Sequence, residues 1–203
     1  ELRIVAWLAG EEKMLAAFEN DEDLHQRTAN ALGLDRQTGK VANFGLLYGA
    51  GARKLKWIAE ENYGVQMSEN KASMIRSAWF NAYPDIEFYH EACIGEAQTT
   101  GKITNVFGRE RPLPDIHNAD YKKKGAAERQ AINTPIQSVA SDITLFSLVQ
   151  VYNDVYLTAM GVEPLATVHD SILFSIPTTA LGDTIPYIQS VMENPGLEEY
   201  LGV

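Results

Sequence analysis

The sequence predicts an α+β fold in which a long helical region is followed by the start of a smaller unit with an antiparallel hairpin. Three observations support this prediction. Residues 1–100 read as a series of helices, and residues 101–114 are rich in Gly and Pro. Two short β-rich runs, 164–168 and 172–176, then flank His169-Asp170-Ser171, which is typical of a hairpin turn.

The elements of the first half follow from breaks in the pattern. Residues 1–31 predict one helix, a break at Gly-Glu-Glu and a second helix beginning near Asp21, with Asp23 or a neighbouring residue as its N-cap. A helix around 36–50 ends in a Gly-rich turn. Residues 53–63 and 68–100 predict further helices, the second interrupted before Pro84 because proline disfavours helix at the preceding residue.

The second half begins with turns and short strands at 101–114. A long helix is expected from about 119 to 160, and Pro135 should kink or interrupt it because proline removes a backbone donor. The hairpin follows, and a last helix is expected over roughly 178–193. No internal repeat divides the chain.

Composition and charge restrict the classes of protein. The 203 residues are 45% hydrophobic, but no apolar run approaches the roughly 20 residues of a membrane span. The lone Cys93 rules out an internal disulfide and fits a reducing compartment. Although the net charge is −10, all 17 Lys and Arg lie at or before Arg129, with local clusters at 35–56 and 102–129. An acidic chain can therefore still present cations where phosphates bind.

The most informative segment is residues 36–49, where Arg36, Lys40, Phe44 and Tyr48 recur at steps of four. On a helix each such step rotates by roughly 40°, so the side chains form one stripe. The opposite, core-facing side would carry Val41, Ala42, Gly45 and Leu46. Two cations followed by two aromatic rings suit a triphosphate with a base beyond it. Spacing alone leaves open a half-buried helix with a solvated basic edge.

The segment resembles the fingers helix of family-A DNA polymerases, the polymerase I type, with its pattern Arg-x-x-x-Lys-x-x-x-Phe-Gly-x-x-Tyr-Gly. Three further blocks follow the family's order. Residues 1–6 resemble the end of the first palm motif, residues 128–137 the helix after the fingers, and residues 168–171 the metal-binding palm hairpin. Four ordered blocks reach from residue 1 to residue 171, so chance agreement is not a credible explanation.

The resemblance implies a right-hand polymerase fold: a mostly helical fingers subdomain at 10–115, with part of an antiparallel-sheet palm at 1–9 and 116–203. The palm is expected to be incomplete, with early strands and the thumb before residue 1 and a closing strand beyond residue 203.

The implied activity is template-directed DNA synthesis from deoxynucleoside triphosphates, in replication or repair, by nucleotidyl transfer with two Mg²⁺ ions. The implied partners are primer–template DNA and the triphosphates, with no membrane and no obligate protein partner. The expected location is the bacterial cytoplasm, for a bacterial protein or for a phage protein in its host.

The resemblance also implies site residues. Asp170 would bind the metals. Arg36 and Lys40 would grip the β- and γ-phosphates, Phe44 would lie against sugar and base, and Tyr48 would stack at the template position until the helix closes. The metal ligand, the phosphate-binding cations and this tyrosine form the expected catalytic set. Two further residues complete the expected nucleotide site: His25, which would reach the triphosphate, and Glu1, which would exclude a 2′-hydroxyl.

DNA contacts are implied for a second stripe, Arg129, Asn133 and Gln137, again at steps of four. Such side chains can bond the minor-groove acceptors that all four base pairs present in similar places. Helix capping and subdomain contacts are the structural alternative. His169 would lie near the primer terminus.

Two departures from the family matter. Ser171 replaces a glutamate that follows the hairpin aspartate in the family, which suggests a divergent, phage-like member. The first catalytic aspartate of the family lies four residues before the position matched by Glu1, which is the first residue of this chain. The 203 residues alone are therefore expected to be inactive, and the activity is assigned to a longer parent enzyme.

Two alternatives remain at this stage. In single-subunit RNA polymerases His-Asp-Ser is the usual palm sequence, although Glu1 and Phe44 argue against this class. A non-catalytic chain that binds DNA or nucleotide through its basic stripe is the second alternative.

Overall fold

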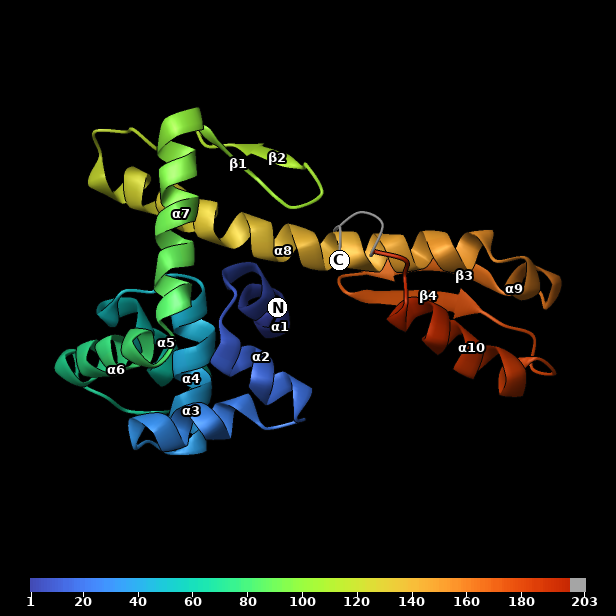
Figure 1. The fold of residues 1–203 in the computed structure, drawn as a ribbon, viewed down its shortest axis with the longest axis horizontal. Coiled ribbons are helices and arrows are strands. Elements are labelled where there is room, and N and C mark those ends of the chain that lie inside the picture. Colours follow the sequence, from blue (N-terminus) through green and yellow to red (C-terminus); the bar gives the residue numbers. More distant parts are fainter. Residues whose placement is uncertain (198–203) are drawn as a thin grey trace. The chain divides into compact units, whose positions relative to one another are not determined.

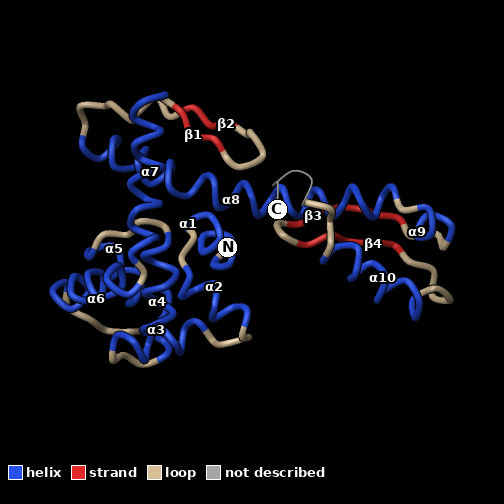
Figure 2. Tube along the Cα trace, in the orientation of Figure 1, coloured by secondary structure: helices blue, strands red, loops and turns tan. Residues whose placement is uncertain are grey.

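Helices make up most of the chain, with two short antiparallel hairpins among them (Figures 1 and 2). The computed structural model describes residues 1–197. In chain order the elements are α1 (Leu2–Ala9), α2 (Glu12–Glu19), α3 (Leu24–Leu32), α4 (Arg36–Leu47), α5 (Ala52–Tyr63), α6 (Glu69–Ala82), α7 (Pro84–Thr100), β1 (Lys102–Thr104), β2 (Glu110–Pro112), α8 (Tyr121–Asn153), α9 (Val155–Ala159), β3 (Glu163–Val168), β4 (Ser171–Ser175) and α10 (Leu181–Glu193). The predicted α+β class is confirmed.

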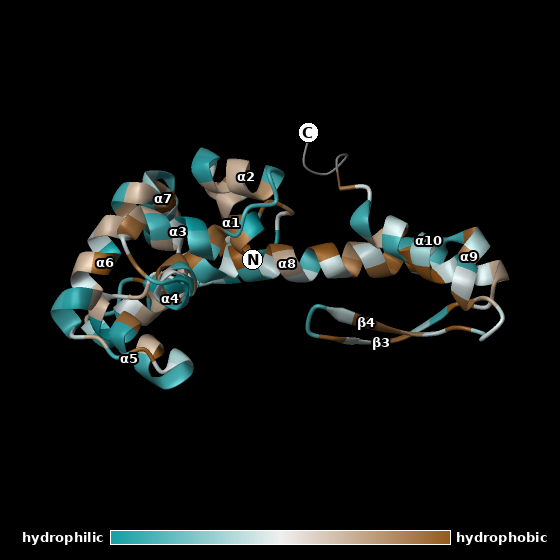
Figure 3. Cartoon of the chain, turned by 90° about the horizontal axis from the view of Figure 1, so that it is seen from below, coloured by the Kyte–Doolittle hydropathy of each residue, from teal (hydrophilic) through white to brown (hydrophobic). Residues whose placement is uncertain are grey.

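The chain divides into two compact units. The first unit contains residues 1–104 and 110–136, and the second contains residues 105–109 and 137–203. Helix α8 contributes residues to both. Figure 3 shows hydrophilic and hydrophobic bands alternating along the helices, as expected where one side of each helix is buried.

Three helices, not the predicted two, precede residue 33. The missed helix, α2, begins where the side chain of Glu11 accepts a hydrogen bond from the Lys13 amide at 3.3 Å. Glu11 is 1% exposed and also accepts from the Asp85 amide at the start of α7 (3.2 Å). Burial raises the pKa of this carboxyl. One side chain thus satisfies free donors at two helix starts, which no local pattern reveals.

Other predicted boundaries agree with the structure. Asp23 is the N-cap of α3, and α6 ends at Ala82 so that Pro84 can open α7. The single helix predicted over 119–160 is wrong, because the structure has two helices there, α8 and α9. Asp154 caps a separate helix, α9, by accepting from the Leu157 amide at 2.9 Å. The expected interruption at Pro135 is not found, since α8 continues through this residue.

Two hydrophobic clusters form the core of the first unit. The larger cluster packs helices α1, α2 and α4 against helices α6 and α7, and Leu46, Trp79 and Ile86 are fully buried in it. The smaller packs α7 and the β1–β2 hairpin against α8 around Ile103 and Ala131. Helix α4 therefore has a fixed inner face, and its remaining surface is available for a site.

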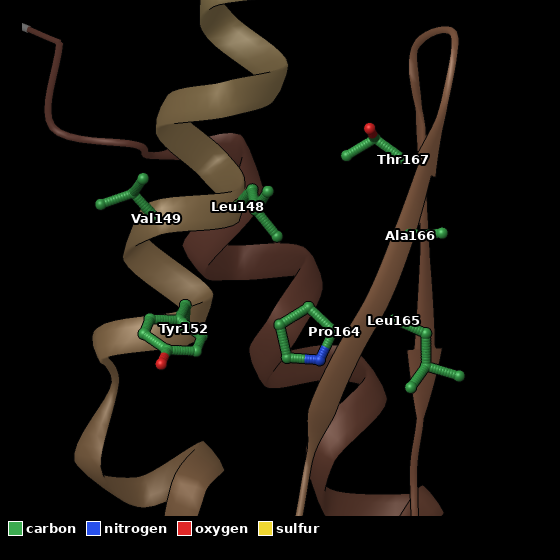
Figure 4. A pocket seen from close by; sticks show the side chains of 7 residues that line it. All are labelled: Leu148, Val149, Tyr152, Pro164, Leu165, Ala166 and Thr167. Atoms are coloured by element: carbon green, nitrogen blue, oxygen red, sulfur yellow. The ribbon is translucent and has the colours of Figure 1, made fainter.

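In the second unit, β3 and β4 pair antiparallel, from Glu163 opposite Ser175 to Val168 opposite Ser171, as predicted. A cavity of about 420 Å³ lies between α8 and β3, lined by Leu148, Val149, Tyr152 and residues 164–167 (Figure 4). Its lining contains no charged side chain, so it lacks the groups that bind phosphate or metal. Within residues 1–197 there is no helix long and apolar enough to cross a membrane.

Candidate functional site

The stripe predicted on residues 36–48 lies on the outer side of α4. Asp35 starts this helix by accepting hydrogen bonds from the amide and hydroxyl of Thr38, at 2.9 and 2.6 Å. The predicted inner face is confirmed, because Val41, Ala42 and Leu46 are at most 1% exposed. The four stripe residues are exposed or half-buried. Helix α4 therefore presents two cations and two aromatic rings from a rigid, half-buried support.

Arg36 is held at one nitrogen only. Its Nε donates to the Asp23 carboxylate at 2.6 Å, and the side chain is 53% exposed. Asp23 also caps α3, and the guanidinium together with that capping holds the pKa of its carboxyl below the usual range. Among the described residues, none bonds the two terminal nitrogens of Arg36, so the planar edge suited to a phosphate is available.

Lys40 lies one turn further along α4 and is half-buried. Its ammonium is 5.7 Å from the centre of the Tyr63 ring, near the outer limit of a cation–π contact. No carboxylate in residues 1–197 forms an ion pair with it. The positive charge is therefore not neutralised within this part of the chain.

His25, from α3, lies beside the stripe, and its ring centre is 5.4 Å from that of Phe44. This neighbourhood depends on the close crossing of α3 and α4 at Gly39. A Cβ at Gly39 would lie 2.6 Å from the carbonyl oxygen of His25 and 3.0 Å from the Ala29 amide nitrogen. Only glycine allows the two backbones to approach so closely.

Tyr48 ends α4, and its hydroxyl donates a hydrogen bond to the carboxylate of Glu1. Burial and this bond raise the pKa of Tyr48, so the phenol stays protonated. This bond links the end of α4 to the first residue of the chain. His90 supports the same end of α4, because its Nε2 lies 2.9 Å from the carbonyl oxygen of Leu47.

The second stripe lies along α8. Arg129 and Asn133 belong to the first unit and Gln137 to the second; the arginine and the glutamine are exposed. The amide oxygen of Asn133 is buried and has no hydrogen-bond partner in the described part of the chain. Because a buried polar atom without a partner is costly, this oxygen is a candidate acceptor for a bound molecule.

His169 and Asp170 form the turn between β3 and β4 in the second unit, where His169 has a positive φ of 56°. Asp170 is exposed, and Ser171 is the first residue of β4. Residues 1–197 contain no group of three or more His, Cys, Asp or Glu side chains that could hold a metal ion. The residues present fit one ligand of a metal site and do not form a complete one.

Sequence reasoning missed two buried polar residues, Asn43 beside the site and Asp142 in the second unit. Asn43 is fully buried on the inner face of α4, and Asp142 in the second unit is 5% exposed. Asp142 accepts from Arg109 and from the amide of Asn105 (2.8 Å), which anchors loop 105–109 on α8. A polar residue inside an otherwise apolar face was the one available signal for Asn43.

Comparison with known proteins gives a consistent result. The profile of DNA polymerase family A matches residues 1–200. DNA polymerase I of Streptococcus pneumoniae (strain ATCC BAA-255 / R6) is 31% identical over an alignment 203 positions long, which covers 95% of this chain and 22% of that protein. DNA polymerase I of Deinococcus radiodurans is 34% identical, over 96% of this chain and 20% of that protein. The chain thus spans about a fifth of the length of these curated relatives.

A solved structure is also similar. The POL domain of Pol1 from M. smegmatis, in complex with DNA primer–template and dNTP, superposes with a TM-score of 0.83 at 26% sequence identity. The match covers 96% of this chain and 35% of that chain.

Proposed function

The chain belongs to DNA polymerase family A, and we propose from this that the whole protein extends a DNA primer on a template, using deoxynucleoside triphosphates. The observation that carries the assignment of the nucleotide site is the outer stripe of α4, where the terminal nitrogens of Arg36 and the ammonium of Lys40 are available to an anion. In this proposal, residues 10–115 form the fingers, and residues 1–9 and 116–203 belong to the palm.

The stripe is assigned to the incoming nucleotide. The terminal nitrogens of Arg36 bind phosphate oxygens in pairs, and Lys40 adds a compact positive charge one turn along α4. Phe44 lies against the sugar and base. Tyr48 and Glu1, already joined by a hydrogen bond, close the far end of the site, where the carboxylate leaves no room for a ribose 2′-hydroxyl.

The palm residues are assigned to metal and DNA. Asp170 supplies one carboxylate of a site for two Mg²⁺ ions, with the other ligands outside the described residues. When bound, such ions favour the ionised primer hydroxyl and stabilise the leaving pyrophosphate. Arg129, Asn133 and Gln137 contact the minor groove, and His169 lies near the primer terminus. Because the matched relatives are bacterial DNA polymerases I, we place the protein in the bacterial cytoplasm.

Primer extension by the whole protein tests the nucleotide site. A charge-assisted hydrogen bond is worth about 1.5–3 kcal/mol, so Arg36→Ala and Lys40→Ala should each lower kcat/KM for dNTP roughly 10- to 150-fold. Lys54→Ala is the matched control, because Lys54 is an exposed cation on α5 whose ammonium lies 3.3 Å from the centre of the Trp57 ring. An equal loss in the Lys54 variant would contradict the assignment of the stripe.

The metal assignment needs its own variant. Asp170→Ala should abolish extension at every Mg²⁺ concentration while primer–template binding persists, and full activity of this variant would refute the assignment.

A second function is favoured for the 203 residues alone, because the part of the chain that is described lacks a complete metal site. We propose that this piece binds nucleotide or DNA without turnover. Extension by the isolated chain, at a rate comparable to that of the whole protein, would show this to be wrong.

A further inference from the structure

A buried hydrogen-bond network connects the inner face of α4 to His25. Its central residue, Asn43, is 0% exposed, as are Thr28 and Trp79. The Asn43 amide oxygen accepts from the Trp79 indole at 2.8 Å and from the Thr28 hydroxyl at 3.0 Å. The Asn43 amide nitrogen lies 3.0 Å from Nδ1 of His25. Both ends of this side chain are therefore used, in a place that water does not reach.

The orientation of the amide is fixed by Trp79. An indole N–H can only donate, so the Asn43 atom that faces it must be the oxygen. The nitrogen then faces His25 and can only donate, so Nδ1 of His25 must be an unprotonated acceptor. In a neutral imidazole the proton is consequently on Nε2. Inverting the amide would set its nitrogen against the indole N–H of Trp79, donor against donor at a fully buried position.

Nε2 of His25 points to no partner within residues 1–197, and the ring is half-buried beside Phe44. The charged groups facing the ring are Asp23 at the start of α3 and Arg36 and Lys40 on α4. Burial is the largest influence on His25 and lowers its pKa; the two cations act in the same direction, and Asp23 opposes them. A proton on Nδ1 would also collide with the Asn43 amide, so three effects favour the neutral ring.

We propose that Asn43, oriented by the Trp79 indole, is a positioning residue that fixes His25 as its Nε2–H tautomer and so presents a neutral donor to a phosphate oxygen of the incoming nucleotide. This inference rests on the proposed function for its ligand, but the tautomer itself does not depend on it. Two cations already supply charge at this site, and the histidine adds a directed hydrogen bond that does not change with pH near neutrality.

The direct test is ¹⁵N NMR of the histidine rings in the whole protein, with selective ¹⁵N-histidine labelling and assignment by the His25→Gln variant. At pH 7.5 without nucleotide, Nδ1 of His25 should resonate as an unprotonated ring nitrogen and Nε2 as a protonated one. The opposite pattern, or an imidazolium, overturns the proposal. This reading requires no catalysis, so it remains informative even where the proposed function fails.

Three variants separate positioning from a general effect on folding. Trp79→Phe keeps an aromatic ring but removes the orienting donor, so the His25 tautomers should mix. Asn43→Asp offers only acceptors, so Nδ1 should become protonated and the pKa of His25 should rise. Tyr83→Phe is the matched control. It removes a bond to Thr28 in the same buried network (2.8 Å) without touching the Asn43 amide, and the tautomer should be unchanged.

Kinetics then test the ligand. Loss of one directed bond to a phosphate should raise KM for dNTP on the order of tenfold in Trp79→Phe, with kcat little changed. In Asn43→Asp the KM should acquire a pH dependence near neutrality that the wild type lacks. The NMR pattern could be as expected while dNTP does not shift the His25 resonances and the KM for dNTP is the same in Trp79→Phe as in the wild type. That result overturns the role of His25 in nucleotide binding. A protein with both signatures but no primer extension would instead refute the proposed function.

Discussion

The substitution Gly39→Ala probes the crossing of α3 and α4, on which the nucleotide site depends. The added Cβ would lie 2.6 Å from the carbonyl oxygen of His25, whereas ordinary contact begins near 3.4 Å. The opposing atoms belong to the backbone and cannot rotate away. The two helices must therefore separate by up to about 0.8 Å at this point, the difference between these two distances.

Two opposing effects set the magnitude. Overpacking of a tight contact costs about 1–3 kcal/mol. Alanine in place of glycine inside a helix contributes about 1 kcal/mol in the other direction. We therefore expect Gly39→Ala to lower the free energy of unfolding by roughly 0–2 kcal/mol, the difference between these two effects. Because α3 carries His25, the shift should also raise KM for dNTP.

Gly95→Ala is the matched control, because Gly95 lies inside α7 and a Cβ there would meet nothing within 4 Å. This variant should gain about 0.5–1 kcal/mol from helix propensity alone. Urea denaturation of both variants, followed by tryptophan fluorescence, measures the difference. If Gly39→Ala is as stable as Gly95→Ala, the close crossing of α3 and α4 does not limit this position, and the reasoning fails.

Two further predictions concern supporting residues. Burial lowers the pKa of His90 to about 4, from about 6.5 in the unfolded chain, so acidification from pH 7.5 to 5 protonates this histidine only in the unfolded state and should lower the free energy of unfolding by about 2 kcal/mol. The variant His90→Gln keeps a donor for the carbonyl of Leu47 and should lose much less stability between the two pH values in urea titrations. An unchanged pH dependence in this variant would show that His90 is not its origin. The substitution Asp142→Ala removes the carboxylate that accepts a hydrogen bond from Asn105 (2.8 Å). Amide hydrogen exchange in loop 105–109 should therefore accelerate on the order of tenfold. Unchanged exchange would show that other contacts hold the loop.

The sequence was most informative where one helix carries its own pattern. The stripe of Arg36 and Lys40 was found because steps of four place side chains on one face, and the apolar residues between them mark the buried side. The hairpin at residues 163–175 was found for a similar reason, since β-rich runs flank a turn. Each of these signals lies within a few residues, so no distant contact was needed.

The elements that were missed depend on distant partners. Helix α2 begins at Glu11, whose carboxylate also serves the start of α7, 74 residues further along the chain. In the sequence, Asn43 interrupts an apolar helix face without an evident reason. The reason is the hydrogen bond that it accepts from the indole of Trp79, 36 residues away. Periodicity reports which side of a helix is buried, but it cannot say what a buried polar group will meet.

Gly39 and Asn43 lie one turn apart on α4, and both face α3. At the first position the absence of a side chain lets the backbone of His25 approach, and at the second the amide reaches the imidazole of the same residue. The two substitutions proposed at these sites act on different quantities, the separation of the helices and the position of a proton. A histidine on a neighbouring helix can act as a directed donor only when the separation of the helices and the position of its ring proton are both fixed. The inner face of α4 therefore determines what the outer face can bind.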